Sequence, residues 1–189
     1  MSYLATKSGS SNNAELESTA PALRLHHRAY KCRNSEETRH FYEDILEMPL
    51  AHAMEVRNLT ATTGQLVDFL HIFFELGDGS YIAFFDLGDG KSAVNDPETP
   101  EFATRFSMLV RGEEDLLAIM RRLADHGVPF EGPIEHQGYL RSIYLRDPNG
   151  IRIEFTYEIA DGKLARDVKE HDSKCREMLK SWVKEHSLA

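Results

Sequence analysis

The sequence is poor in cysteine, in basic runs and in long apolar stretches, and each shortage removes a class of function. Only Cys32 and Cys175 occur among 189 residues, which excludes a disulfide framework and a cysteine-based zinc site. The formal net charge is −9 with no concentrated basic run, so nucleic acid and anionic membranes are not expected partners. A small molecule or another protein chain is expected instead.

The ends of the chain carry little recognisable chemistry. No apolar stretch reaches the roughly 20 residues of a membrane-spanning helix, and no basic start precedes an apolar run. We therefore expect a cytoplasmic protein. Residues 1–22 are rich in Ser, Asn and Thr and are expected to form a disordered leader.

The clearest pattern lies in residues 141–157. The turn from Asp147 to Gly150 contains Pro, Asn and Gly, and the flanking residues alternate between apolar and polar. Alternation places Glu154 on the face opposite the apolar residues, with Ser142 and Tyr144 on the same side. A desolvated carboxylate there requires a cation or strong donors. The alternative is a solvent-facing glutamate on a half-exposed hairpin.

Residues 66–86 show the same strand-turn-strand pattern, with Asp78-Gly79 as the turn. When Gly79 is aligned with Gly150, the paired positions are His71 with Ser142, Phe73 with Tyr144, and Ala83 with Glu154. The chain is therefore predicted to be internally duplicated.

Each repeat extends into a strand-helix-strand-strand-strand unit, which makes the expected fold class α+β. Residues 23–88 contain a strand at 23–32, a helix that begins at Asn34 or Ser35, and a strand at 50–57. A loop at 58–65 follows, and residues 66–86 contain the last two strands. Residues 102–158 contain a strand at 102–110, a helix at 113–126, a short strand near Phe130, a loop through His136 and the final hairpin. A linker at 87–100 separates the units.

Residues 159–189 are expected to form a C-terminal helical extension. Apolar residues recur there at helical spacing: Leu164, Val168, Cys175, Met178, Leu179 and Trp182. We expect this face to pack on the protein's own sheet. The alternative is that it covers a second subunit in a homodimer.

Three segments carry a resemblance to the vicinal oxygen chelate superfamily, which includes glyoxalase I, extradiol dioxygenases and bleomycin-binding proteins. They are Leu25-His26-His27-Arg28-Ala29-Tyr30, the segment from Glu37 to Leu46, and Asp147-Pro148-Asn149-Gly150 followed by Glu154. The resemblance covers residues 23–158 and implies that the modules 23–88 and 102–158 form an open, cup-shaped mixed sheet that holds a divalent metal.

The resemblance implies His27 and Glu154 as metal ligands. Ala83 occupies the third ligand position, and Arg105, or Thr104 if the alignment shifts by one residue, occupies the fourth. His71 shares the inward parity of Ala83 and is the candidate third ligand. Two histidines and one carboxylate suit Fe²⁺ best, with Mn²⁺, Ni²⁺ or Zn²⁺ as alternatives.

Two functions are consistent with these residues. The first is a metal-dependent enzyme similar to extradiol dioxygenases, or to lyases and isomerases of the glyoxalase type, in which the metal binds two neighbouring oxygens of a small substrate. The resemblance gives Tyr144 the role of orienting the substrate and His136 that of acid or base. Ser142 is expected to contact the substrate as well.

The second is a metal-free protein of the bleomycin-resistance type that sequesters a small molecule. Arg105 then pairs with Glu154, or holds an anionic group of the ligand. Phe73, Phe85 and Tyr144 would pack against the ligand.

Overall fold

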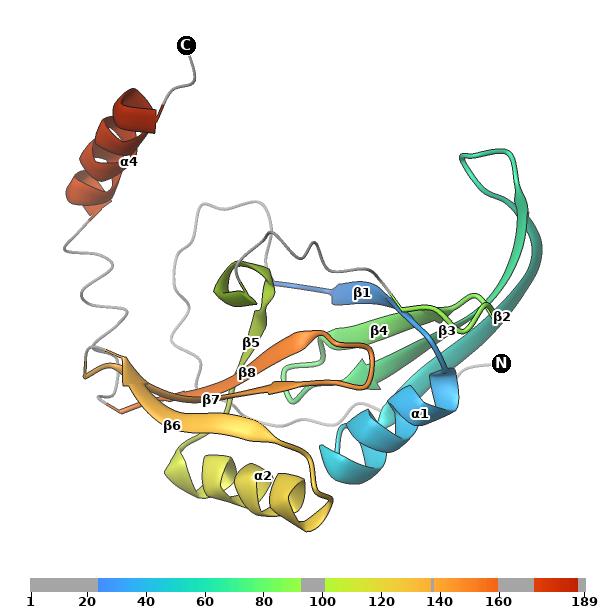
Figure 1. The fold of residues 1–189 in the computed structure, drawn as a ribbon, viewed down its shortest axis with the longest axis horizontal. Coiled ribbons are helices and arrows are strands. Elements are labelled where there is room, and N and C mark those ends of the chain that lie inside the picture. Colours follow the sequence, from blue (N-terminus) through green and yellow to red (C-terminus); the bar gives the residue numbers. More distant parts are fainter. Residues whose placement is uncertain (1–23, 93–100, 137, 160–171, 187–189) are drawn as a thin grey trace, which may run out of the picture.

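The computed structural model describes residues 24–92, 101–136, 138–159 and 172–186 (Figure 1). The expected leader and residues 93–100 of the expected linker lie outside these ranges. The fold is α+β, as predicted, with two four-stranded mixed sheets and a C-terminal helix.

Module 1 runs from β1 to β4. Its elements are β1 (His27–Cys32), α1 (Ser35–Arg39), the π-helical η1 (His40–Ile45), β2 (Leu50–Thr60), β3 (Leu66–Glu75) and β4 (Tyr81–Asp86). The strand order is β1-β4-β3-β2, with β1 parallel to β4. The Asn34 side chain accepts a hydrogen bond from the Glu37 amide and starts α1, as the sequence predicts.

Module 2 repeats this arrangement. Its elements are η2 (Glu101–Thr104), β5 (Phe106–Leu109), α2 (Glu113–Asp125), β6 (Phe130–His136), β7 (Leu140–Arg146) and β8 (Arg152–Glu158). The order β5-β8-β7-β6, with β5 parallel to β8, matches module 1 and confirms the duplication. Gly127, with φ of +66°, ends α2 because this left-handed conformation suits glycine.

Three boundaries differ from the prediction. Strand β2 continues to Thr60, so part of the expected loop is strand. Arg105 lies between η2 and β5 instead of within a strand. His136 ends β6 instead of lying in a loop, because β6 pairs with β7 as far as the His136–Leu140 position.

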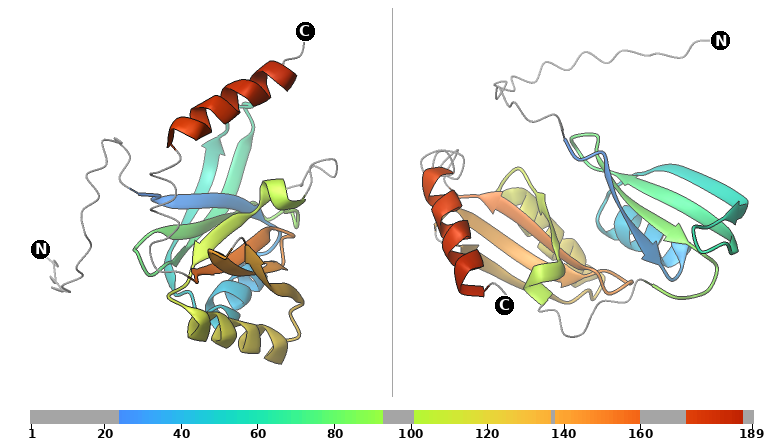
Figure 2. Two further views of the ribbon diagram at one scale, coloured as in Figure 1. Left: turned by 90° about the vertical axis from the view of Figure 1, so that its left-hand side faces the viewer. Right: turned by 90° about the horizontal axis from the view of Figure 1, so that it is seen from above.

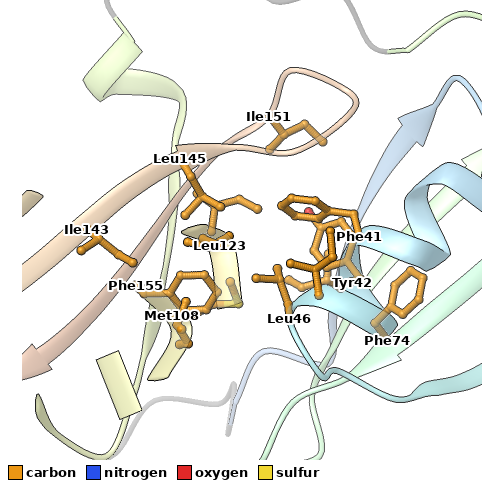
Figure 3. Packing of buried hydrophobic residues seen from close by; sticks show 14 of the residues in the cluster. Phe41, Tyr42, Leu46, Phe74, Met108, Leu123, Ile143, Leu145, Ile151 and Phe155 are labelled. Carbon is orange, nitrogen blue, oxygen red and sulfur yellow. The ribbon is translucent and has the colours of Figure 1, made fainter. Parts of the chain in front are cut away.

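The two modules share one hydrophobic core. Figure 3 shows Phe41, Tyr42 and Leu46 of module 1 facing Leu145 and other residues of module 2. Alternate residues of β3, β4, β7 and β8 enter this core: Ile72, Phe74, Ile82, Phe84, Ile143, Leu145, Ile153 and Phe155. The residues between them therefore lie on the opposite faces of the two sheets.

The turn between β7 and β8 also connects module 2 to module 1 by hydrogen bonds. Asn149 Oδ1 accepts a hydrogen bond from the Arg33 amide at 3.0 Å, and Asn149 Nδ2 donates to Thr38 Oγ1 at 3.2 Å. The Tyr42 hydroxyl donates to Asp147 Oδ2 at 3.2 Å. Thr38, Tyr42, Asp147 and Asn149 are buried, so the hydrogen bonds satisfy polar atoms at the junction of the modules.

Helix α4 (Asp172–His186) stands apart from both sheets (Figure 1). Its apolar side chains are 53–69% exposed: Met178, Leu179, Trp182 and Val183. For these residues the expectation that this face packs on the protein's own sheet is wrong, whereas Leu164 and Val168 lie outside the described ranges. Among the described residues, no helix has the length and apolar composition to cross a membrane.

Candidate functional site

A polar cluster lies on the face of the module 2 sheet that is turned away from the shared core. Tyr144 on β7 and Glu154 on β8 are directly paired in the ladder. The Tyr144 hydroxyl donates to Glu154 Oε1 at 2.9 Å, and Arg105 Nε donates to Glu154 Oε2 at 2.7 Å. Only 4% of the glutamate is exposed, so these donors replace the water that its charge has lost.

The electrostatics favour an ionised Glu154. Burial alone would raise the pKa of this carboxyl group, but the hydrogen bond from Arg105 and the other donors hold it below its usual range. The pKa of Tyr144 is raised by burial and by its contact with the carboxylate. At neutral pH the cluster therefore contains a carboxylate, a neutral phenol and a guanidinium.

His136 joins the cluster through Tyr144, with 2.7 Å between His136 Nε2 and the Tyr144 hydroxyl. The tyrosine has one proton, and the carboxylate of Glu154 can only accept it. The Tyr144 oxygen therefore accepts a hydrogen bond from Nε2–H of His136. His136, Tyr144, Glu154 and Arg105 form one continuous network.

Ser142 is buried next to this network, and its hydroxyl is among the groups that lower the pKa of Glu154. Its Oγ donates to Thr156 Oγ1 at 2.9 Å across the β7–β8 ladder. The cluster includes one residue that the sequence analysis did not select: the Arg152 guanidinium lies 5.1 Å from the centre of the Tyr144 ring. Arg152 precedes Glu154 by two residues, so strand alternation places both on the same face, and this spacing could have identified Arg152 from the sequence.

The second group of candidates lies on the outward face of the module 1 sheet. The ring centres of His27 and His71 are 6.3 Å apart. His71 stacks on Phe85 at 3.7 Å and lies 4.1 Å from Phe73. Burial lowers the pKa of His71, and the nearby His27 lowers it further, so its ring is neutral at pH 7. Its Nε2 is buried and has no hydrogen-bond partner in the described part of the chain.

The structure thus separates residues that the sequence analysis combined. His27, His71, Phe73 and Phe85 lie on one sheet, whereas Arg105, His136, Ser142, Tyr144 and Glu154 belong to the other module. Within the described ranges, no three His, Cys, Asp or Glu side chains form a group that could hold a metal ion.

The donor set of one chain does not fit the metal that the resemblance implies. Module 1 offers two imidazoles but has Ala83 at the position equivalent to Glu154. Glu154 itself is neutralised by Arg105. A catalytic site with one ion uses about three protein ligands, which is more than either module supplies among the described residues.

A cavity of about 1100 Å³ opens between the modules, beside the edge strands β1 and β5. Arg28 and Arg105 line it, together with Tyr30 and Phe106, whose rings stack at 5.7 Å. The Arg28 guanidinium lies 5.0 Å from the centre of the Tyr30 ring. The parity of β1 places Arg28 on the apolar side of the strand, where a charge is unexpected, and the cavity accounts for it.

The comparisons with known proteins agree with this fold. A model of the glyoxalase/bleomycin resistance protein/dioxygenase superfamily matches residues 24–155. Comparison with curated protein sequences gives no match.

Several solved structures share the architecture. A glyoxylase/bleomycin resistance protein/dioxygenase domain from Frankia sp. EAN1pec is 20% identical, with a TM-score of 0.54 over 76% of this chain and 96% of that one. A glyoxalase/dioxygenase from Nostoc punctiforme is 20% identical, with a TM-score of 0.52 over 78% and 99%. Lactoylglutathione lyase from Agrobacterium tumefaciens is 17% identical, with a TM-score of 0.50 over 73% and 96%. Because the family model matches most of the sequence and the fold agrees with it, this chain belongs to the glyoxalase/bleomycin resistance protein/dioxygenase superfamily.

Proposed function

We propose that the protein binds a small organic anion without a metal, in the cavity that Arg105 lines. The observation that carries this proposal is the Arg105–Glu154 ion pair, with 2.7 Å between Nε and Oε2. In this pair the guanidinium supplies the positive charge that a metal ion would otherwise give to the buried carboxylate.

The geometry of Arg105 leaves it able to serve a ligand as well. About 34% of its side chain is exposed, compared with 6% for Glu154. A guanidinium has five N–H donors in a planar fork that suits carboxylate and phosphate groups. The stacked rings of Tyr30 and Phe106 give the same cavity an apolar wall.

Titration with 8-anilinonaphthalene-1-sulfonate, a planar apolar anion, tests this proposal. We expect saturable binding that falls at least tenfold in the double variant Arg105→Gln/Glu154→Gln, which removes both charges and leaves no carboxylate unpaired. Arg121→Gln, an exposed arginine on α2, is the matched control. Equal binding by both variants would refute an anion site at Arg105.

Arg105→His gives a second test. If this substitution creates or greatly strengthens divalent metal binding, the natural protein is not built for metal. If the unaltered protein already binds a stoichiometric metal ion, and Glu154→Ala abolishes that binding, the metal-free proposal fails.

The second candidate function is a metal-dependent enzyme of the glyoxalase or dioxygenase type. Its specific support is His71, whose buried Nε2 has no hydrogen-bond partner among the described residues and belongs to a neutral ring. When bound, a divalent ion would act as a Lewis acid on two neighbouring substrate oxygens. His27 and His71 would hold it, and Glu154 of a second chain would complete the set in a homodimer.

Elemental analysis and sedimentation distinguish this candidate from the first. The enzyme requires a dimer with a stoichiometric metal ion, which could be Fe²⁺, Mn²⁺, Ni²⁺ or Zn²⁺. Both His71→Ala and Glu154→Ala should then lose the metal. Unchanged metal content in Glu154→Ala would count against the proposed ligand set.

A further inference from the structure

Arg28 occupies a position at which the two modules differ in charge. Arg28 pairs with Ile82 on β4, and Phe106 pairs with Ile153 on β8. The two isoleucines occupy matching positions of the duplicated ladder, are 3% and 0% exposed, and enter the shared core. Arg28 and Phe106 are therefore equivalent, and both lie on the core-facing side of their sheets. Module 1 has a cation where module 2 has an aromatic ring.

The described residues give Arg28 no counter-ion. Its guanidinium lies 5.0 Å from the centre of the Tyr30 ring, and no carboxylate in the described part of the chain pairs with it. Asp78 lines the same cavity, but it accepts hydrogen bonds from the Ser80 hydroxyl and amide. These hydrogen bonds lower the pKa of Asp78, and the cation that lowers it further is Arg24. Arg28 is exposed in the cavity, so its charge is available to a ligand.

The other two arginines of the cavity already have carboxylate partners. Arg105 is paired with Glu154 at 2.7 Å, and Arg111 is paired with Asp115 at 2.6 Å. Among the described lining residues, Arg28 is therefore the cation that lacks such a partner.

Most of the remaining lining is apolar. Leu25 and Leu109 line the cavity and are 60% and 70% exposed, and Phe106 and Met108 lie beside them in the lining. Covering these side chains would remove apolar surface from water. The volume of about 1100 Å³ is that of a site for an organic molecule, not for an inorganic ion. Asp78 in the same lining opposes a second negative group.

We propose that the ligand of this cavity is an amphipathic monoanion, with one carboxylate that contacts Arg28 and an apolar body that lies against Phe106 and Leu109. A guanidinium binds a carboxylate through two parallel hydrogen bonds, which a neutral head group of the same size cannot form. This inference rests on the proposed anion-binding function and specifies its ligand class and the residue that contacts the anionic group. Arg105 contributes the second positive charge of the lining.

Calorimetric titration with octanoate and 1-octanol tests this inference, because the two probes have the same chain length and differ in charge. We expect octanoate to bind the unaltered protein at least about fivefold more tightly than 1-octanol. Arg28→Gln should weaken octanoate by a similar factor and leave 1-octanol unchanged. Arg28→Lys, which keeps the charge without the planar fork, should recover part of the loss. Arg121→Gln, an exposed arginine on α2, is the matched control and should change neither probe.

Arg28→Phe separates recognition from a structural role, because it copies the residue of module 2. This variant should bind 1-octanol at least as tightly as the unaltered protein and lose the preference for octanoate. Thermal unfolding without a probe should show no fall in Tm for Arg28→Phe or Arg28→Gln. A lower Tm in both variants, together with loss of both probes, would assign Arg28 a structural role and overturn the inference.

The outcomes separate this inference from the function on which it rests. If Arg28→Gln keeps octanoate while Arg105→Gln/Glu154→Gln loses the sulfonate probe, the inference is refuted and the anion site at Arg105 stands. If Arg28→Gln loses octanoate while the double variant keeps both anions, Arg28 is the anion site and the role of Arg105 is refuted. If neither variant loses an anion, both fail. Equal binding of octanoate and 1-octanol by the unaltered protein would also refute the inference.

Discussion

The two modules have the same ladder but place different chemistry on it. In module 1 the pair Phe73–Ala83 occupies the position that Tyr144–Glu154 occupies in module 2. Next along the strands, a stacked His71–Phe85 pair contrasts with a hydrogen-bonded Ser142–Thr156 pair.

This difference shows that two copies of one fold unit can carry different side chains at equivalent outward positions. Module 1 presents an aromatic face that contains the neutral ring of His71. Module 2 presents a hydrogen-bonded network of charged and polar side chains. Both modules have the same backbone register, because the turn residues and the shared core fix it. The outward residues are free to differ because they do not contribute to that core.

The largest expected effect comes from truncating matched residues that the two modules contribute to their shared core. Phe84 and Phe155 occupy matching positions and are 0% and 2% exposed. Phe84→Ala and Phe155→Ala should each lower the free energy of unfolding by about 3–5 kcal/mol. Because the modules share one core, chemical denaturation of each variant should remain a single transition. Two separate transitions would show that the modules unfold independently.

Giving module 1 the carboxylate of module 2 should have the next largest effect. Ala83 is fully buried, and the ladder places Ala29 and Phe73 on either side of it. Ala83→Glu is expected to cost about 2–4 kcal/mol of unfolding free energy, because a carboxylate would be buried without a cation. Ala83→Gln has similar volume and no charge, so it should cost less at neutral pH. Equal losses in denaturant titrations would assign the effect to crowding alone.

Acid should distinguish the two buried carboxyl groups of module 2. The folded-state pKa of Glu154 is below its ordinary value of 4.5, so its stabilisation is complete above that pH and is lost as the pH falls through the folded pKa. Burial raises the pKa of Asp147, so protonation of this group at low pH favours the folded state.

Glu154→Gln should therefore cost about 1 kcal/mol at pH 7 and less as the solution is acidified. Denaturant titrations of the variant and the unaltered protein at a series of pH values measure this difference. A constant gap from pH 7 down to pH 3 would mean that the charge of Glu154 contributes nothing to stability.

The smallest effect is expected outside both modules. Trp182 on α4 is 62% exposed, so Trp182→Ser should change the unfolding free energy by less than about 0.5 kcal/mol. The measurement is thermal unfolding together with sedimentation at several protein concentrations. A large loss of stability that depends on concentration would show that α4 is covered by a second subunit.

Local patterns in the sequence predicted a large part of the site. Alternation and the turn at Asp147 together fix the register of β7 and β8, so the adjacency of Tyr144 and Glu154 could be inferred before the fold was known. The pairing of Arg105 with Glu154 could be stated as one of two alternatives, since a buried carboxylate needs a positive neighbour.

Long-range packing was not accessible in the same way. Alternation shows that His71 and Glu154 each lie opposite an apolar face, but it does not show that the two apolar faces meet in one core. That contact turns the two candidate clusters away from each other. The strand position of His136 and the place of Arg28 in a cavity also depend on contacts between distant segments.

The hydrogen bonds of the Asp147–Asn149 turn have a consequence for biosynthesis. A ribosome delivers the N-terminal half first, so Tyr42 and Thr38 emerge more than 100 residues before Asp147 and Asn149, their buried partners. Until that turn leaves the exit tunnel, the first helix lacks the surface that completes it. Nascent chains stalled before residue 147 should therefore remain protease-sensitive, and a few residues at the end of translation commit both halves to their final arrangement.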